Sequence, residues 1–285
     1  MSYAVVFAIL SLLLSGVSDI VFKIYTAEKR SRGMFLFGVG FVWTLSQFGI
    51  AQIQETPLAI DQATLVYGLM AGVFLTISNI MLLEILGHIE VSLATTIYRL
   101  NTIGVVLFSY FMLNETFGWI KGIGIFLGLI AVFFLYKSQS HQTHQNKLLL
   151  FMGIAVVASL FRAAYGVSSK VGFLEGANRD TMLIIIALSW VVGGASYAIF
   201  REKRFRMTWE KARFIMVSSI LIVGIANFLM LAIQYGEAST VIPIANMSFV
   251  VALLLSVALK MEKMNMMKLG AITCAIGSIL LLSQS

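Results

Sequence analysis

Charged residues are scarce in this chain of 285 residues, at 12%, whereas hydrophobic residues make up 59%. An ordinary soluble domain carries roughly 25% charged residues. A chain with a mean hydropathy of +0.94 cannot cover its apolar surface in water, so lipid must be its solvent. The composition therefore excludes an ordinary soluble protein and predicts an integral membrane protein.

Cysteine and histidine are also nearly absent, with one Cys and three His. The single Cys274 lies inside an apolar run, so we expect neither a disulfide framework nor a cysteine metal site. No HExxH, GxSxG or phosphate-binding GxxxxGK pattern occurs, and these are the signatures of zinc proteases, serine hydrolases and ATP-driven proteins. The sequence therefore predicts no enzyme activity, no metal and no cofactor.

What the chain does contain is a series of ten long apolar segments. Each is long enough to cross a hydrocarbon core of about 30 Å as a helix. They lack the alternation of barrel strands, and a helix satisfies every backbone polar group within the segment, as lipid requires. We predict an all-α fold with transmembrane helices over residues 3–24, 33–52, 63–86, 91–113, 118–136, 148–171, 180–200, 212–234, 238–259 and 264–283.

The sequence repeats itself at an offset of 147 residues. Leucine matches in apolar runs arise by chance, but this offset also superimposes scarce residues, and such self-similarity indicates duplication. We predict two five-helix repeats, residues 1–136 and 148–285, joined by a polar linker over 137–147. The matches are Lys23 with Lys170, Arg32 with Arg179, Trp43 with Trp190, Glu90 with Glu237, Ser92 with Ser239, Glu115 with Glu262 and Lys121 with Lys268.

An odd number of helices per repeat fixes the relation between the two copies. The second copy must enter the membrane from the opposite side, which is the inverted-repeat arrangement of many secondary transporters. With ten spans, only Lys121 and Arg179 lie on one side, and all other Lys and Arg outside the spans lie on the opposite side. The positive-inside rule makes the basic side cytoplasmic and places both termini on the non-cytoplasmic side of a cell (inner) membrane. These loops also account for the net charge of +7, so we expect no nucleic-acid partner.

Two arginines are predicted near the middle of the bilayer, namely Arg99 in the fourth span and Arg162 in the sixth. An ionisable side chain at this depth costs a few kcal/mol or more unless it has a partner or a watery cavity. Both are therefore candidate substrate-binding residues. The alternative is a structural arginine that joins helices through backbone carbonyls.

One face of the sixth span carries Arg162, Tyr165, Ser169 and Lys170, at helical spacing. The equivalent face of the first span carries Asp19 and Lys23, which can pair at i and i+4. In an inverted repeat these faces meet at the pseudo-two-fold axis, where substrates bind. We therefore add Tyr165, Lys23, Lys170 and Asp19 as candidates, with snorkelling of the lysines as the alternative.

Four further residues complete the candidate set. Trp43 and Trp190 lie at mid-span, where they either line a cavity or fill the core. Asn246 is the repeat equivalent of Arg99. Glu84, near one membrane face, is the candidate for proton coupling, with an ordinary interfacial residue as the alternative.

A family resemblance follows from these features. The first and sixth spans are rich in small and polar residues and end in Lys23 and Lys170, and the sequence FMLNE at 111–115 recurs as ALKME at 258–262 before a glycine-bearing span. In this the chain resembles the EamA-type branch of the drug/metabolite transporter superfamily. The resemblance implies a single-chain carrier that holds a small metabolite centrally among spans of both halves.

The buried charges suggest the class of solute. Four basic residues lie within the spans, against Asp19 and Glu84, so we expect an anionic or zwitterionic solute such as an amino acid or organic acid. The predicted function is a secondary transporter that works by alternating access, with protons as a candidate coupling ion. We expect a monomer or homodimer. The alternatives are an intramembrane enzyme and a channel or sensor subunit.

Overall fold

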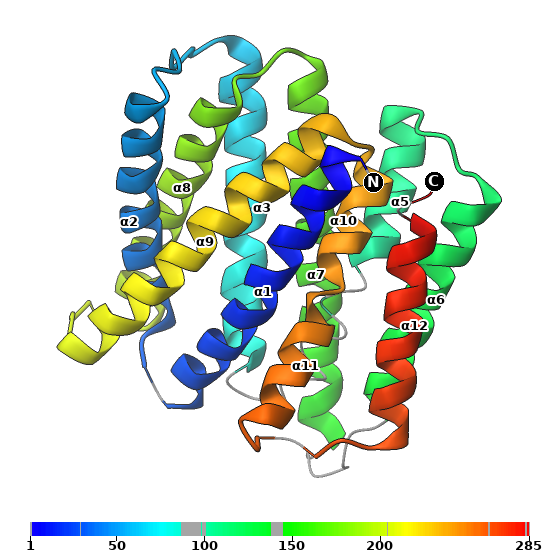
Figure 1. The fold of residues 1–285 in the computed structure, drawn as a ribbon. Coiled ribbons are helices and arrows are strands. Elements are labelled where there is room, and N and C mark those ends of the chain that lie inside the picture. Colours follow the sequence, from blue (N-terminus) through cyan, green and yellow to red (C-terminus); the bar gives the residue numbers. More distant parts are fainter. Residues whose placement is uncertain are drawn as a thin grey trace.

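A computed structural model describes residues 2–28, 30–86, 98, 101–137, 145–203, 205–261, 263–282 and 284. In these ranges helix is the only regular structure, and Figure 1 shows the helices gathered into one bundle. The first repeat contains α1 (Tyr3–Ala27), α2 (Arg32–Ile53), α3 (Gln62–Leu86), α5 (Asn101–Leu113) and α6 (Trp119–Lys137). The second contains α7 (Gln145–Leu174), α8 (Arg179–Ser196), the π-helical turn η1 (Tyr197–Arg201), α9 (Trp209–Tyr235), α10 (Ala238–Asn246), α11 (Ser248–Ala258) and α12 (Met266–Leu282).

Short polar residues mark where several of these helices begin. Ser31 accepts a hydrogen bond from the Met34 N–H at the start of α2, at 3.0 Å, and Asn178 accepts one from the Thr181 N–H at the start of α8, at 2.9 Å. Each satisfies an N–H that the first helical turn leaves without a partner. The polar breaks between the apolar runs therefore act as helix caps.

Helices occupy all ten predicted segments, although residues 91–97, 99 and 100 of the fourth lie outside the described residues. The all-helical, multi-pass fold class is confirmed for the described part of the chain. Seven helical stretches are long and apolar enough to cross a membrane, namely Tyr3–Thr26, Arg32–Ile53, Gln62–Leu86, Gly153–Leu174, Arg179–Arg201, Trp209–Tyr235 and Ala238–Ala258. Three apolar helices are shorter, namely Asn101–Leu113, Trp119–Ala131 and Met266–Leu282.

The outer surface of the bundle is apolar, as contact with lipid requires. Large hydrophobic side chains are exposed along the middle of several helices, including Leu45 at 57%, Val192 at 66% and Ile220 at 70%. Exposed apolar areas of this extent are rare on soluble monomers. In a bilayer they face acyl chains, so this surface is compatible with the predicted membrane location.

The ninth predicted span is interrupted rather than continuous. Pro243 lies inside α10 and has no N–H to donate to the preceding turn, which weakens the helix at this point. The helix ends at Asn246, and the N–H of Met247 bonds the carbonyl of Ile244 in a tighter turn, at 3.0 Å, before α11 begins. The span predicted over 238–259 is therefore made of two helices that meet at Met247.

The two repeats are packed into each other rather than side by side. The most extensive contacts all join helices from different repeats: α2 with α8, α6 with α12, α1 with α9, and α3 with α7. Figure 1 shows three of these pairs as neighbours, with α2 beside α8, α1 beside α9 and α6 beside α12. At the repeat offset α1 corresponds to α7 and α9 to α3, so the α1–α9 and α3–α7 contacts are equivalent.

Glycine allows the backbones of α2 and α8 to touch. A Cβ atom added to Gly194 would lie 2.3 Å from the backbone nitrogen of Phe37, and one added to Gly33 would lie 2.4 Å from that of Ala198. Both distances are shorter than any real contact. Small residues at such crossings permit the close helix packing that stabilises membrane bundles.

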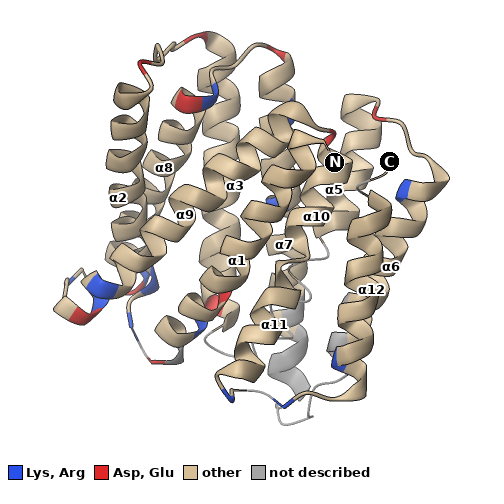
Figure 2. Cartoon of the chain, in the orientation of Figure 1, with Lys and Arg blue, Asp and Glu red and all other residues tan. Residues whose placement is uncertain are grey.

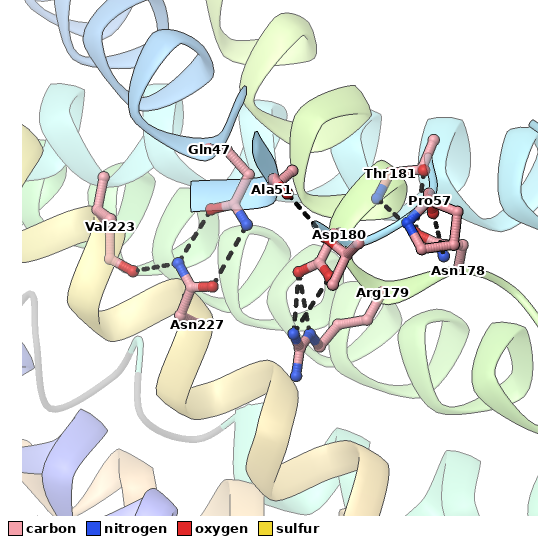
Figure 3. A network of polar contacts seen from close by, with 10 residues as sticks. Gln47, Ala51, Pro57, Asn178, Arg179, Asp180, Thr181, Val223 and Asn227 are labelled. Atoms are coloured by element: carbon pink, nitrogen blue, oxygen red, sulfur yellow. Dashed lines mark hydrogen bonds and ion pairs between the residues drawn. The ribbon is translucent and has the colours of Figure 1, made fainter. Parts of the chain in front are cut away.

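A network of polar contacts lies towards the end of the bundle at which α8 begins (Figure 3). Gln47 of α2 and Asn227 of α9 exchange hydrogen bonds, the shorter at 3.0 Å. Asn178 donates to the carbonyl of Pro57 at 3.1 Å, and Arg179 pairs with Asp180 at 3.0 Å. These contacts join elements from both repeats at one end of the bundle.

The two ends of the bundle differ in charge. Figure 2 shows most Lys and Arg residues, coloured blue, at the end where α1 finishes and α9 begins. The first residue of α1 and the last of α12 lie towards the opposite end (Figure 1). The charge asymmetry predicted from the loops is therefore present in the described residues.

Candidate functional site

A cavity lies in the middle of the bundle, between helices of both repeats. Its empty volume is about 570 Å³, part of it open to solvent. Apolar residues of α3 and α9 form much of its wall. Its polar and aromatic lining consists of Ser15, Ser18 and Asp19 of α1, Trp43, Asn79, Tyr98, Arg162, Tyr165 and Trp190.

A second, smaller cavity adjoins the first and has an empty volume of about 340 Å³. It extends towards α5 and α10, where Asn101 and Asn246 line it. Ser15, Arg162 and Tyr165 line both cavities. Arg162 and Tyr165 of α7 therefore lie at the junction between the two cavities.

Arg162 is held between aromatic rings. Its guanidinium carbon lies 5.7 Å from the ring centre of Tyr98 and 5.8 Å from that of Tyr165, which is cation–π distance. Tyr98 is itself fixed, because its hydroxyl lies 3.0 Å from that of Ser78, which donates to the Ala158 carbonyl. Among the described residues Arg162 forms no hydrogen bond and no ion pair, so it does not join helices through backbone carbonyls there.

Asp19 brings a negative charge to the same cavity as Arg162. It is on α1, at the position predicted to face the second repeat. Lys23, one turn further along α1, is half-buried and is not part of the wall of either cavity. The structure therefore brings Asp19 and Arg162 to one site and leaves Lys23 outside it.

Trp43 and Trp190 meet at the centre of the molecule. Their ring centres are 5.5 Å apart at an interplanar angle of 86°, an edge-to-face contact. Both side chains are buried and both line the larger cavity. In the described part of the structure neither indole N–H has a hydrogen-bond partner. Trp43 and Trp190 occupy equivalent positions in the two repeats, so the repeats touch here through equivalent residues.

Lys170 is placed away from the cavities, at the end of a neighbouring helix. Its ammonium donates to the carbonyls of Ile233, at 3.0 Å, and Gly236, at 2.8 Å. These carbonyls belong to the last turn of α9 and its cap, which a cation stabilises through hydrogen bonding and the helix dipole. In this structure Lys170 therefore joins α7 to α9.

The remaining candidates have separate surroundings. Asn246 donates to the side-chain oxygens of Asn101, at 2.6 Å, and Thr102, at 3.1 Å. Glu84 forms an ion pair with Arg32 and accepts a hydrogen bond from Tyr197, outside both cavities. Arg99 lies outside the described residues. Within the described ranges no group of three or more His, Cys, Asp or Glu is placed to hold a metal ion.

Several residues that matched at the repeat offset form a cluster between repeats. The Glu115 carboxylate accepts hydrogen bonds from the N–H groups of Ala238, at 2.8 Å, and Ser239, at 3.0 Å, and so caps α10. Lys121 pairs with Glu237 and donates to the Ser239 hydroxyl and the Thr116 carbonyl. Lys268, its repeat equivalent, donates to the carbonyl of Lys263, the equivalent of Thr116, at 3.0 Å.

Sequence reasoning missed three residues of the site: Tyr98, Asn79 and Asn101. Two are side-chain amides within predicted spans, and an amide in a membrane span is the signal that could have identified them. Tyr98 gave no such signal, because tyrosine is common in membrane helices.

Known proteins share both the sequence pattern and the fold of this chain. The sequence model of the EamA-like transporter family matches residues 2–137 and, a second time, residues 149–284. No curated protein matches the chain in sequence. A solved structure titled "Crystal structure of protein" superimposes with a TM-score of 0.79, over 99% of this chain and 96% of its own, at 14% identity. At this identity the likeness shows the fold alone.

The family matches cover almost the whole chain and show that one family domain occurs twice, as the 147-residue offset predicted. The limits 1–136, 137–147 and 148–285 stay a prediction. Members of this family are membrane transporters rather than enzymes. The chain therefore belongs to the EamA-like transporter family, the family that its sequence resembles.

Proposed function

We propose that the protein is a secondary transporter that moves a small anionic or zwitterionic metabolite across the inner membrane by alternating access. The observation that carries this proposal is the Arg162 guanidinium, which lines the central cavity with no acidic partner among the described residues. An uncompensated charge at mid-bilayer is costly. An anionic group of a bound solute would compensate it.

The charges of the cavity favour a zwitterion. Arg162 supplies a positive charge and Asp19 a negative one, on α7 and α1 respectively. A solute with a carboxylate and an ammonium group complements both. The hydroxyls of Ser15 and Ser18 and the amide of Asn79 offer further hydrogen bonds for a small polar molecule.

Alternating access is supported by the relation between the repeats. Ten spans in two inverted five-helix repeats would place the cavity at the repeat interface, as in other inverted-repeat carriers. The equivalent α1–α9 and α3–α7 contacts and the meeting of Trp43 with Trp190 agree with a two-fold relation. The basic end of the bundle would be cytoplasmic and both termini non-cytoplasmic.

Proton coupling through Glu84 is a further part of the proposal. Protonation of its carboxylate would break the ion pair with Arg32. Because Arg32 is on α2 and Glu84 on α3, binding of a proton would then change the contact between these two helices. Whether the carrier is a monomer or a homodimer stays a prediction.

Counterflow in proteoliposomes tests the proposed function. Vesicles loaded with a pool of amino acids and organic acids should accumulate a labelled member of that pool, which a channel would not do. We expect Arg162→Ala to abolish accumulation. Arg179→Ala, which removes an arginine paired with Asp180 outside the cavities, should retain it. Accumulation of lipophilic cations only, equal in both variants, would refute the proposal.

A further inference from the structure

The smaller cavity has a lining unlike that of the larger one. Asp19 lines only the larger cavity, and none of the described residues that line the smaller one is an Asp or Glu. Arg162 lines both and therefore offers its positive charge to each. In the smaller cavity, therefore, no carboxylate of a described wall residue neutralises the charge of Arg162.

An amide donor in the wall of the smaller cavity has no partner. Asn101 is 1% exposed, and its side-chain oxygen accepts the hydrogen bond from Asn246. Its side-chain nitrogen has no hydrogen-bond partner in the described part of the structure. A buried donor left unpaired is destabilising, so a bound acceptor would stabilise this arrangement.

Some of the other polar groups of this wall already form hydrogen bonds within the protein, and others can donate one to a ligand. The Ser11 hydroxyl donates to the Ile225 carbonyl at 3.2 Å, and the amide nitrogen of Asn246 is used on Asn101 and Thr102. The Tyr165 hydroxyl has no hydrogen bond to any described residue, and Arg162 has only its two ring contacts. The Arg162 guanidinium, the Asn101 amide nitrogen and the Tyr165 hydroxyl of this wall can therefore each donate a hydrogen bond to a bound acceptor.

We propose that the smaller cavity is the subsite for the carboxylate end of the transported solute, held by the Arg162 guanidinium and the Asn101 amide nitrogen. This inference rests on the proposed transport function and deepens it. A carboxylate only accepts hydrogen bonds, so it can accept those that Arg162 and Asn101 have available. The solute then extends through both cavities past Arg162 and Tyr165, with its ammonium end towards Asp19 in the larger cavity. Asn101 acts as a specificity-determining residue for acids over their neutral amides.

The test compares two probes that differ only in the carboxylate. One is the amino acid that scores best in the counterflow assay, and the other is its carboxamide, which keeps the ammonium group and the side chain. In Asn101→Asp the hydrogen bond from Asn246 is retained, but an acceptor replaces the donor. We expect the half-saturating concentration of the acid to rise at least about tenfold, as for loss of a hydrogen bond to a charged group, while that of the carboxamide changes less than about threefold.

Asn101→Leu is a second variant of similar shape and without charge, and it should lower the acid-to-amide preference in the same direction. Asn227→Ala removes a half-buried amide outside both cavities and should leave the preference unchanged. Thermal unfolding of each variant separates loss of fold from loss of specificity.

An equal weakening of both probes in folded Asn101 variants would overturn the subsite and leave the transporter proposal intact. Absence of counterflow for every acid in the wild-type protein would instead refute the transport proposal, and the subsite with it.

Discussion

Lys121 lies buried where α6 meets the start of α10, with its side chain 3% exposed, whereas its partner Glu237 is 45% exposed. The two halves of this ion pair should therefore respond differently to removal. Glu237→Gln leaves a buried ammonium without its carboxylate. Lys121→Met removes the buried charge and leaves Glu237 in contact with water.

The contacts of Lys121 set the size of the difference. Removing one partner of a fully buried pair costs about 3–5 kcal/mol. The Thr116 carbonyl and Ser239 hydroxyl still accept from Lys121 after Glu237→Gln, so we expect about 2 kcal/mol of destabilisation. Lys121→Met should cost less than about 1 kcal/mol, because a half-exposed carboxylate is stabilised by solvent. The ratio of folded to unfolded protein then differs several-fold between the variants.

Unfolding by SDS in mixed micelles, followed by tryptophan fluorescence, measures these free energies. The double variant completes a cycle that isolates the interaction of the pair. Lys121→Met should be the more stable single variant, and the double variant should resemble it. If Lys121→Met destabilises the protein as much as Glu237→Gln, the burial argument is wrong.

Two further perturbations act elsewhere. Gly194→Ala places a methyl group 2.3 Å from the Phe37 backbone nitrogen and should lower the free energy of unfolding by about 1–3 kcal/mol. The control Gly49→Ala, whose added Cβ has nothing within 4 Å, should not lower it. Equal unfolding midpoints for the two variants would contradict this expectation. Hydrogen bonds from Thr64 hold the pKa of Asp61 below its ordinary value, so the stability that Asp61 adds exists above its unfolded pKa and is lost as pH falls through its folded pKa. Asp61→Ala should therefore unfold at a lower temperature than the wild type at pH 7, with the gap closing below about pH 4, and a gap that does not depend on pH would count against this.

Much of the fold could be predicted from the sequence because lipid allows few solutions. Apolar length alone located the helices, and the 147-residue offset identified the repeat. That offset also matched Trp43 with Trp190, which the structure places in contact, and Lys121 with Lys268, which bond equivalent carbonyls. Scarce residues at equivalent positions thus marked one contact between the repeats and one contact that recurs within each repeat.

The site was less predictable because it depends on which helices meet. Periodicity placed Arg162 and Tyr165 on one face of α7, and both line the cavities. The same face predicted Lys170, but the last turn of α9 lies near that end of α7 and takes up its hydrogen bonds. The contact of Asn101 with Asn246 could not be predicted, because the two are 145 residues apart. Such distant pairings leave no mark on local sequence.

The packing of each repeat into the other has a consequence for biogenesis. The polar face of α1 is covered by α9, a helix that the ribosome completes roughly 200 residues later. At translation rates of 5–20 residues per second this delay is roughly 10–40 s. During that time Ser15, Ser18 and Asp19 are in the membrane without the helix that covers them in the folded protein. The first five helices alone are therefore an unfinished structure, and the insertion machinery has to shelter them until the second repeat arrives.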